Sequence, residues 1–173
     1  MKQLILGGAR SGKSALAEKL AADSGREVVY IATATQGDAE MADRIALHRQ
    51  RRPAHWHLLE EPLNLAQTLE AQAAEGRCLL VDCLTLWLSN LLFIDDGIHF
   101  QPQRDALLER LPQLPGEIIL VSNEVSMGIV PLGEISRRFQ DESGLLHQNL
   151  AGLCDRVLLT VAGLPVILKG PAL

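Results

Sequence analysis

The stretch that decides the fold is Gly7-Gly8-Ala9-Arg10-Ser11-Gly12-Lys13-Ser14. It fits the pattern G-x-x-x-x-G-K-[ST], in which glycines let the backbone wrap around phosphate with its N–H groups pointing inward. The lysine of this pattern places a charge on the outer phosphates, and the serine hydroxyl can bind Mg²⁺. Here the motif follows an apolar run at 3–6 and opens a helical stretch at 14–23. This context predicts a P-loop rather than an ordinary glycine-rich turn, and the helix dipole adds to its attraction for phosphate.

Further apolar runs alternate with helical patterns along the rest of the chain. Nearly continuous apolar character predicts strands that are covered on both faces of a parallel sheet. The predicted strands are residues 3–6, 27–32, 78–82, 117–122 and 156–161. A last strand at 166–169 follows the short turn Gly163-Leu164-Pro165, which is brief enough for an antiparallel hairpin.

Helices are predicted between these strands. Their ranges are 14–23, 38–52, 63–75, 84–93 and 132–153. Gly144 indicates a break inside the last helix, residues 95–102 are the most loop-like insertion, and Pro112 and Pro115 mark another connection. Strands that alternate with helices predict an α/β fold, with a mostly parallel sheet flanked by helices and a short C-terminal antiparallel hairpin.

Size and charge limit the classes of function. With 173 residues, 47% of them hydrophobic, the chain suits one domain over residues 1–173. The net charge of −5 argues against general binding to nucleic acid or to anionic membranes. Six aromatic residues are too few for a surface on which single strands would stack their bases.

The cysteines and the apolar segments indicate the compartment. Cys78, Cys83 and Cys154 are odd in number and have no C-x-x-C spacing, which excludes a disulfide framework or a zinc site. We therefore expect a reducing cytoplasm. The N-terminal apolar run ends at Gly7, too early for a signal peptide, and the longest apolar stretch, 84–94, is too short for a membrane span.

Asp82 is the predicted second half of the phosphate site. It follows the apolar residues 79–81, and an acidic residue at the end of a parallel strand is where a Walker B carboxylate holds Mg²⁺ or its water. Glu124, after the strand ending at residue 122, competes for this role. A helix cap or a surface carboxylate is the structural alternative for Glu124.

A basic cluster follows the second strand. His48 precedes Arg49, Gln50, Arg51 and Arg52, and on an acidic protein this arrangement predicts a local phosphate-binding patch. Imidazole can also attack phosphorus and form a phosphoramidate. The structural alternative, a surface or partly packed histidine, remains open on spacing alone.

The other histidines and nearby carboxylates carry weaker signals. His55 and His57 alternate on one strand-like face without a third metal ligand, so a structural role is favoured. His99 and His147 have no clear partner in the sequence. Glu60 and Glu61 lie before Pro62 and either reach the same crevice or form a solvated turn.

Several runs in order resemble one known family. They are the P-loop at 7–14, Ile31-Ala32-Thr33, the stretch from Arg44 through His48 to Arg52-Pro53-Ala54-His55-Trp56, Val81-Asp82-Cys83-Leu84-Thr85, and Val121-Ser122-Asn123-Glu124-Val125 with Met127-Gly128-Ile129-Val130-Pro131. Together they resemble the bifunctional adenosylcobinamide kinase/adenosylcobinamide-phosphate guanylyltransferases of cobalamin biosynthesis. The resemblance covers nearly the whole chain, and its runs RPAHW and NEVxMGIVP are far more specific than the P-loop.

The resemblance implies two reactions. Adenosylcobinamide is phosphorylated with ATP or GTP, and GMP then passes from GTP through a histidine, matching His48, to give adenosylcobinamide-GDP and pyrophosphate. It also implies a RecA-like P-loop fold, Mg²⁺, and a homotrimer. The expected Mg²⁺ ligands, from the P-loop motif and the strand end, are Ser14 and Asp82. The implied nucleotide contacts are Gly7, Gly8, Ala9, Arg10, Ser11, Gly12, Lys13, Ser14, Ala32, Thr33, Ala34, Arg49, Gln50, Arg51, Arg52, Glu60 and Asp82.

Two departures and two alternatives accompany this interpretation. Ser126 stands where the family more often has glycine, and Gln148 follows His147 where asparagine is expected, so both departures concern the corrinoid side. One alternative is a simple P-loop kinase of a small metabolite, which needs no histidine. The other is a RecA-like ATPase acting on nucleic acid or protein, against which the acidic charge argues.

Overall fold

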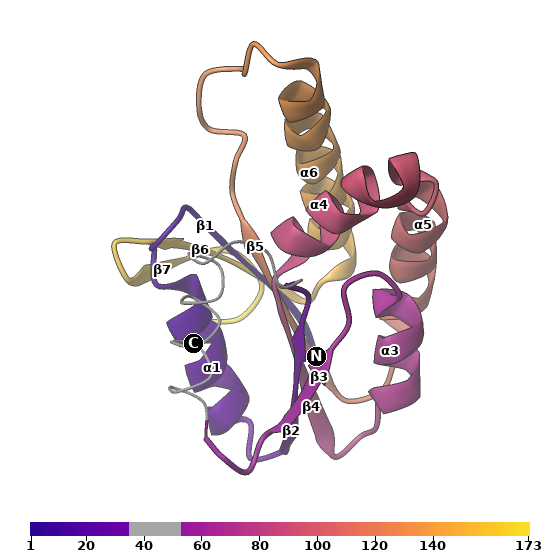
Figure 1. The fold of residues 1–173 in the computed structure, drawn as a ribbon. Coiled ribbons are helices and arrows are strands. Elements are labelled where there is room, and N and C mark those ends of the chain that lie inside the picture. The colour runs from indigo at the N-terminus through magenta and orange to yellow at the C-terminus, as the bar shows by residue number, and fades with distance from the viewer. Residues whose placement is uncertain (35–52) are drawn as a thin grey trace.

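The computed structural model describes residues 1–34 and 53–173. Its strands form one seven-stranded sheet in the order β3-β2-β4-β5-β1-β6-β7 (Figure 1). The strand bounds are β1 Lys2–Gly7, β2 Glu27–Ala32, β3 His57–Glu60, β4 Arg77–Asp82, β5 Glu117–Asn123, β6 Arg156–Val161 and β7 Leu164–Lys169. All pairings are parallel except that of β6 with β7, which is antiparallel. The predicted sheet and C-terminal hairpin are therefore confirmed.

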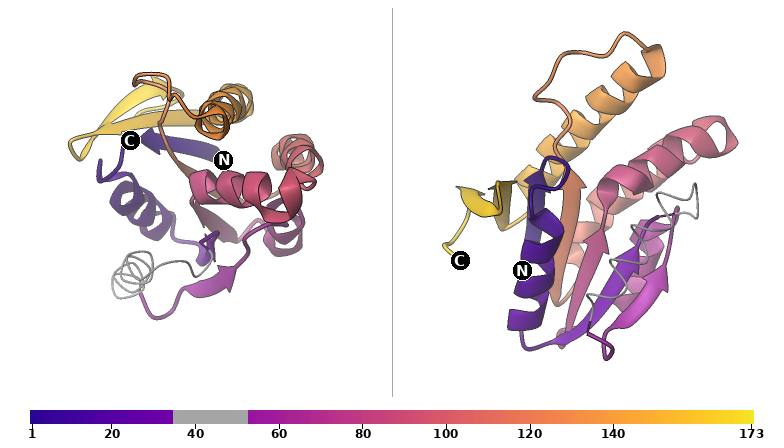
Figure 2. Two further views of the ribbon diagram at one scale, coloured as in Figure 1. Left: turned by 45° about the horizontal axis from the view of Figure 1, so that its top comes forward. Right: turned by 60° about the vertical axis from the view of Figure 1, so that its left-hand side comes forward.

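Helices cover both faces of the sheet unequally. On one face lies α1, and on the other lie α3, α4, α5 and α6 (Figure 2). Their bounds are α1 Lys13–Asp23, α3 Leu65–Gln72, α4 Leu84–Phe93, α5 Phe100–Arg110 and α6 Glu134–Leu153, with 3₁₀ turns η1 Ile94–Gly97 and η2 Leu111–Gln113. Parallel strands joined by helical crossovers require such covering on both faces.

Strand alternation divides the core into two clusters. Leu4 and Leu6 of β1 pack with Trp87 and Leu91 of α4 on one face. Ile5, the residue between them, packs with Ala17 of α1 on the other. Successive side chains of a strand point to opposite faces, so nearly continuous apolar strands supply both clusters at once.

Two predictions about the α4–α6 side were wrong. Residues 95–102, expected to be a loop, contain η1 and the start of α5. Pro102 did not prevent this helix, because it lies in the first turn, where its missing N–H has no helical partner anyway. The helix expected over 132–153 begins at Glu134 and runs 20 residues without the break predicted at Gly144. A single helical glycine costs stability but still permits helical geometry.

The sequence interpretation also missed two elements. Strand β3 was not expected, because its four residues are largely exposed and lie at the sheet edge rather than forming a buried apolar run. Helix α5 was hidden by its polar composition and by the proline in its first turn. The helix predicted over 38–52 falls outside the described residues.

All three cysteines are free and buried. Burial raises the pKa of Cys78 and of Cys154 to about 12 and that of Cys83 to about 11. None of the helices in 1–34 or 53–173 combines the length and apolar character needed to cross a membrane.

Candidate active site

The P-loop leaves β1 at the carboxyl edge of the sheet and turns into α1. The backbone N–H of Ser11 donates to the carbonyl oxygen of Gly8 at 3.2 Å, and Arg10 and Gly12 have positive φ angles of 55° and 95°. Lys13 is only 9% exposed, and its Nζ donates to the Gly8 carbonyl oxygen at 3.3 Å. A lysine folded back over a tight loop at a helix N-terminus is suited to binding phosphate.

Glycine is required at two positions of this loop by close contacts. A Cβ on Gly7 would collide with the Ser11 side chain and lie 2.7 Å from the carbonyl oxygen of Thr160 in β6. A Cβ on Gly12 would lie 3.0 Å from the Cα of Gly163, and its φ angle is one that L side chains rarely adopt. Glycine at these two positions therefore lets the loop pack closely against β6 and the turn that follows it.

The C-terminal hairpin supports the loop from the side. The N–H of Gly163, in the turn between β6 and β7, donates to the Ser11 carbonyl oxygen at 2.8 Å. The P-loop thus contacts β6 and its turn as well as its own strand and helix. This contact joins segments more than 150 residues apart, and no sequence pattern revealed it.

Three of the predicted site residues lie in one row across neighbouring strands. Ala32 at the end of β2 is in register with Asp82 of β4 on one side and with Glu60 of β3 on the other. The row lies at the carboxyl ends of parallel strands, the edge at which α/β proteins bind ligands. Glu60 is thus the exposed last residue of edge strand β3 and does not lie in a turn.

Thr33 has a structural role that the sequence did not reveal. It is fully buried, and its Oγ1 both accepts the N–H of Cys83 at 2.9 Å and donates to the Cys83 carbonyl oxygen at 2.6 Å. These bonds join the ends of β2 and β4. The Thr33 hydroxyl is thereby occupied, and the Ala32 carbonyl oxygen accepts the N–H of Glu61 at 2.9 Å.

Asp82 lies on the same face of the sheet as the P-loop helix. Its strand neighbour Leu80 belongs to the core cluster that includes Ala17 and Ala21 of α1, and side chains two apart on a strand share a face. Tyr30 Oη donates to Asp82 Oδ2 at 3.2 Å. The structure therefore brings Asp82 to the side of Lys13 and Ser14.

The end of β5 carries a buried polar network on the opposite face. Ser122 Oγ lies 2.7 Å from His147 Nε2 of α6, and His147 Nδ1 lies 3.6 Å from Glu124 Oε2. The side chains of His147 and Glu124 are only 7% and 12% exposed. His147, for which the sequence offered no partner, therefore hydrogen-bonds Ser122 and lies beside the Glu124 carboxylate, because α6 brings it back over β5.

Burial and the contacts of this network shift the pKa values of His147 and Glu124. Burial lowers the pKa of His147 and outweighs the raising effect of Glu124, so the imidazole is neutral at pH 7. Burial alone would raise the pKa of Glu124, but hydrogen bonds from the Ser126 side chain and backbone, with His147 adding to them, hold it below its ordinary value. Glu124 thus fixes the turn at Ser126, and it is neither the helix cap nor the surface carboxylate that the sequence offered as its alternative.

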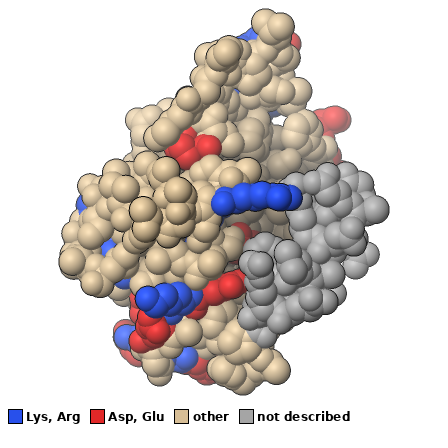
Figure 3. Space-filling view, turned by 90° about the vertical axis from the view of Figure 1, so that its left-hand side faces the viewer, with Lys and Arg blue, Asp and Glu red and all other residues tan. Residues whose placement is uncertain are grey.

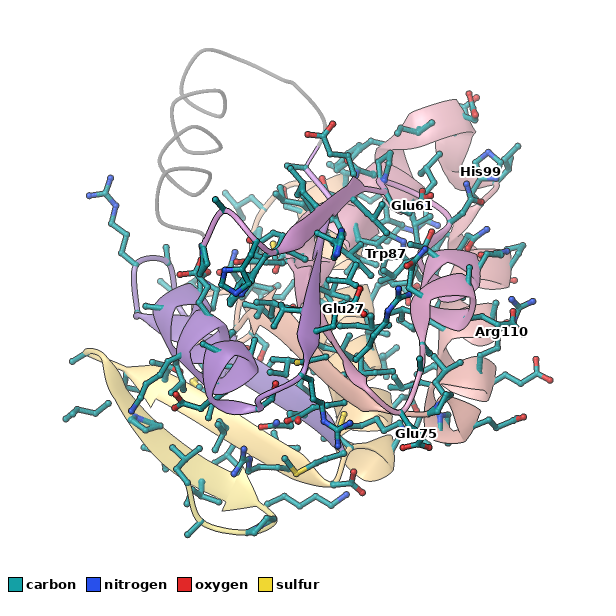
Figure 4. All side chains as sticks on the ribbon, turned by 90° about the horizontal axis from the view of Figure 1, so that it is seen from below. Glu27, Glu61, Glu75, Trp87, His99 and Arg110 are labelled. Atoms are coloured by element: carbon teal, nitrogen blue, oxygen red, sulfur yellow. The ribbon has the colours of Figure 1, made fainter. Side chains whose placement is uncertain are left out.

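The remaining histidines lie apart or outside the described residues. His48 and Arg49, Gln50, Arg51 and Arg52 fall within 35–52, which the structure does not describe. His57 lies 3.4 Å from Glu27, and His99 lies 3.2 Å from Asp95. Figure 4 shows His99 at the periphery of the α4–α5 layer, beyond Trp87. In the described ranges, no three His, Cys, Asp or Glu side chains are grouped as a metal site.

A cavity of about 350 Å³ opens beyond the carboxyl end of β5. Its wall is formed by α4, the segment after β5 and α6, and consists of Ser89, Phe93, Val125, Ile129, Pro131, Ile135, Ser136, Phe139 and Gln140. Gln140 Nε2 donates to the Val125 carbonyl oxygen at 3.1 Å and holds the segment against α6. Figure 3 shows mostly uncharged surface on the upper projection, where this segment lies. Ile129 and Leu132 are 96% and 97% exposed.

Sequence comparisons identify relatives over the full length. Residues 3–168 match the family described as cobinamide kinase / cobinamide phosphate guanyltransferase. The chain is 66% identical over 173 residues to the bifunctional adenosylcobalamin biosynthesis protein CobP of Pseudomonas aeruginosa PAO1, covering 100% of both chains. It is 39% and 40% identical to the CobU proteins of Escherichia coli K12 and Salmonella typhimurium LT2, covering 98% of this chain and 100% of each relative.

Structure comparisons identify the fold. The RadB recombinase matches with a TM-score of 0.52 at 16% identity, over 91% of this chain and 73% of that one. A protein of Pyrococcus horikoshii OT3 matches with a TM-score of 0.53 at 9% identity, over 99% and 87%. The fold is that of the RecA-like P-loop NTPases, as the sequence predicted.

Proposed function

Because this chain belongs to the cobinamide kinase/cobinamide phosphate guanyltransferase family, we propose that it modifies adenosylcobinamide twice, the second time through a guanylylated His48. Family membership makes the chain a bifunctional kinase and guanylyltransferase of cobalamin biosynthesis. The adenosyl form of the substrate, ATP or GTP as phosphate donor, and the histidine intermediate are the finer parts of this proposal.

The observation that carries the proposal is the row of Glu60, Ala32 and Asp82 at the same sheet edge as the P-loop. In the kinase reaction the hydroxyl oxygen of the acceptor bonds to the γ-phosphorus, and the bond to the β-phosphate oxygen breaks. Positioning and charge stabilisation account for most catalysis of this kind. The P-loop backbone, Lys13 and the N-terminus of α1 supply both.

We also propose that Ser14 and Asp82 hold Mg²⁺. Their residue types fit, because Mg²⁺ binds hard oxygen ligands and usually keeps several waters, so one carboxylate and one hydroxyl suffice. Asp82 lies on the P-loop face with a hydrogen bond from Tyr30, and Ser14 is the second residue of α1. The ion would neutralise charge on the phosphates.

In the guanylyl transfer, neutral His48 attacks the α-phosphorus of GTP. A P–N bond forms, the bond from the α-phosphorus to the bridging oxygen breaks, and pyrophosphate leaves. An oxygen of the phosphorylated corrinoid then displaces the histidine and takes GMP. Arg49, Arg51 and Arg52 would stabilise the departing pyrophosphate, and Gln50, Glu60 and the backbone of residues 32–34 would contact the nucleotide.

We propose that the enzyme is a cytoplasmic homotrimer that has no nucleic-acid partner and consists of one domain, residues 1–173. All seven described strands share one sheet, which supports a single domain. Two exposed apolar surfaces support assembly, one at Ile129–Leu132 and one on the β6–β7 hairpin, where Leu164 is 70% and Leu168 56% exposed. A sedimentation measurement should give three times 18.9 kDa, and a mass of 18.9 kDa at micromolar concentration would refute the trimer.

The decisive experiment uses GTP labelled at the α-phosphate, with Mg²⁺ and without corrinoid. The wild-type protein and a His99→Ala control should become labelled, the label should be acid-labile and base-stable, and His48→Ala should stay unlabelled. Added cobinamide phosphate should then remove the label. If GTP binds but no label appears on the wild-type protein, the simple P-loop kinase becomes the better description and His48 is structural.

A further inference from the structure

Asn123 occupies a position next to the P-loop that none of the roles above uses. It is the last residue of β5, which lies in the sheet between β4, the strand of Asp82, and β1, the strand of the P-loop. Asn123 is in register with Gly7, the residue at which the P-loop leaves β1. Val121, two residues earlier, packs in the α1-side cluster, so Asn123 belongs to the face of Asp82 and α1.

The backbone of Asn123 is held firmly from both sides. Its N–H donates to Thr85 Oγ1 at 2.7 Å, and Thr85 Oγ1 lies 3.3 Å from Ser122 Oγ. Ser122 in turn contacts His147 of α6. The next N–H, that of Glu124, donates to the Gly7 carbonyl oxygen at 3.0 Å. Asn123 therefore keeps a fixed position relative to the phosphate loop.

The side chain of Asn123 is polar, buried at its oxygen and unsatisfied. Within the described residues, Asn123 Oδ1 is buried and has no hydrogen-bond partner, and the same holds for Ser11 Oγ and Thr160 Oγ1. Ser11 belongs to the P-loop, and Thr160 and Asn123 are the two register partners of Gly7. Buried polar atoms are nearly always bonded, so three unsatisfied oxygens around one loop point to a polar ligand at that place.

We propose that the side chain of Asn123 contacts the phosphoryl group that is transferred in the kinase reaction, together with the attacking hydroxyl. This inference rests on the kinase reaction of the proposed function. An amide can donate from Nδ2 to a phosphoryl oxygen and accept through Oδ1 from the hydroxyl of the acceptor. The hydroxyl oxygen then bonds to the γ-phosphorus as the bond to the nucleoside diphosphate breaks. An amide is no base, so the proton of the hydroxyl passes to an oxygen of the transferred group.

If so, Asn123 contacts only the γ-phosphate among the phosphates of the nucleotide. A diphosphate leaves the position opposite Asn123 empty, whereas a triphosphate fills it. Asn123→Ala should therefore weaken binding of a non-hydrolysable triphosphate at least tenfold and leave the Kd for the diphosphate within threefold. Removing a hydrogen-bond donor from a developing oxyanion typically costs about 10²–10³ in kcat. We expect the kcat for cobinamide phosphorylation to fall at least tenfold, and the KM for the triphosphate to rise along with its Kd.

The test measures both binding constants and the kinase rate for three variants. Asn123→Asp keeps the shape but adds a negative charge, and it should weaken triphosphate binding more than Asn123→Ala. Gln103→Ala in α5 is the matched control, because Gln103 Oε1 is also buried without a partner but belongs to the α3–α6 side of the sheet. It should leave both constants and the rate unchanged.

Two results would overturn the assignment. One is an Asn123→Ala protein that binds both the triphosphate and the diphosphate with wild-type affinity. The other is an equal loss of both affinities together with a lower melting temperature, which would make Asn123 a purely structural residue. Failure of the wild-type protein to phosphorylate cobinamide would refute the proposed function instead, and the ratio of affinities would still decide the role of Asn123.

Discussion

Gly163 donates its backbone N–H to the carbonyl oxygen of Ser11 at 2.8 Å, which joins the turn of the C-terminal hairpin to the P-loop. The same hairpin presents Leu164, Val166 and Leu168 to solvent. A second copy of the chain seated on this hairpin would therefore press against a segment that directly supports the phosphate loop. In the proposed trimer, an interface on this hairpin would share one short stretch of backbone with the nucleotide site.

Replacing Gly12 should damage the loop through geometry alone. Gly12→Ala places a Cβ 3.0 Å from the Cα of Gly163 and forces a side chain onto a φ angle of 95°. The left-handed conformation costs about 1–2 kcal/mol for an L residue. We expect the free energy of unfolding to fall by at least this amount in urea titrations, and nucleotide affinity to fall at least tenfold by calorimetry. Gly25→Ala is the control, because Gly25 also has a positive φ angle but open space around it. It measures the cost of the backbone conformation without a close contact such as that between Gly12 and Gly163.

The glycine inside α6 offers a stabilising change. A Cβ on Gly144 would meet no atom within 4 Å, and the helix passes through it without a break. Gly144→Ala should therefore raise the free energy of unfolding by about 0.5–1 kcal/mol, measured by chemical denaturation. An unchanged or lower stability would show that Gly144 serves a purpose outside the helix, such as contact with another copy.

Thr33 should prove essential for joining two strand ends. Thr33→Val keeps the shape but removes a hydroxyl that bonds both the N–H and the carbonyl oxygen of Cys83. Leaving a buried polar group unsatisfied costs about 1–3 kcal/mol. The expected result is a loss of that size in unfolding experiments. The comparison is Thr68→Val in α3, because the half-buried Thr68 hydroxyl makes one side-chain bond, to Glu61 at 3.3 Å. Wild-type stability in Thr33→Val would contradict the importance of this link.

His147 should make the protein sensitive to acid. Its folded-state pKa lies below the ordinary value of 6.5, so below that pH the unfolded chain binds more protons than the folded one. Stability conferred by the neutral imidazole is thus present above pH 6.5 and is lost as the pH falls toward the lowered value. Melting temperatures between pH 8 and pH 5 should drop less steeply for His147→Gln than for the wild type.

The comparison for this experiment is His99→Gln, which alters an exposed histidine paired with Asp95. That variant should keep the wild-type slope of melting temperature against pH. Identical slopes for His147→Gln and the wild type would mean that another group dominates the acid sensitivity.

The sequence predicted the parts of the fold that local chemistry determines. The P-loop, the buried strands and α4, whose bounds of 84–93 were predicted correctly, depend on residues close together in the chain. Edge strand β3 and polar α5 escaped notice because their stability comes from packing against neighbours rather than from an apolar pattern. Only the register of the sheet aligned Glu60 with Ala32 and Asp82.

In the candidate site, too, local motifs predicted some residues, whereas long-range packing determined the positions of others. Lys13 and Asp82 were identified from motif and strand position, and the structure places them on one face. Ser122 contacts His147, 25 residues away, because α6 packs over the sheet. Asn123 lies opposite Gly7 because β5 pairs with β1 in this register. A single sequence has no local signal for such contacts.

The burial of every cysteine gives the molecule a practical property. Cys78, Cys83 and Cys154 are all shielded, and the raised pKa values leave hardly any thiolate at neutral pH to react with maleimides. A cysteine introduced at Ile129, which is 96% exposed beside the cavity, would therefore be the one that takes up a fluorophore. An Ile129→Cys variant can thus be labelled for fluorescence without prior removal of the native thiols.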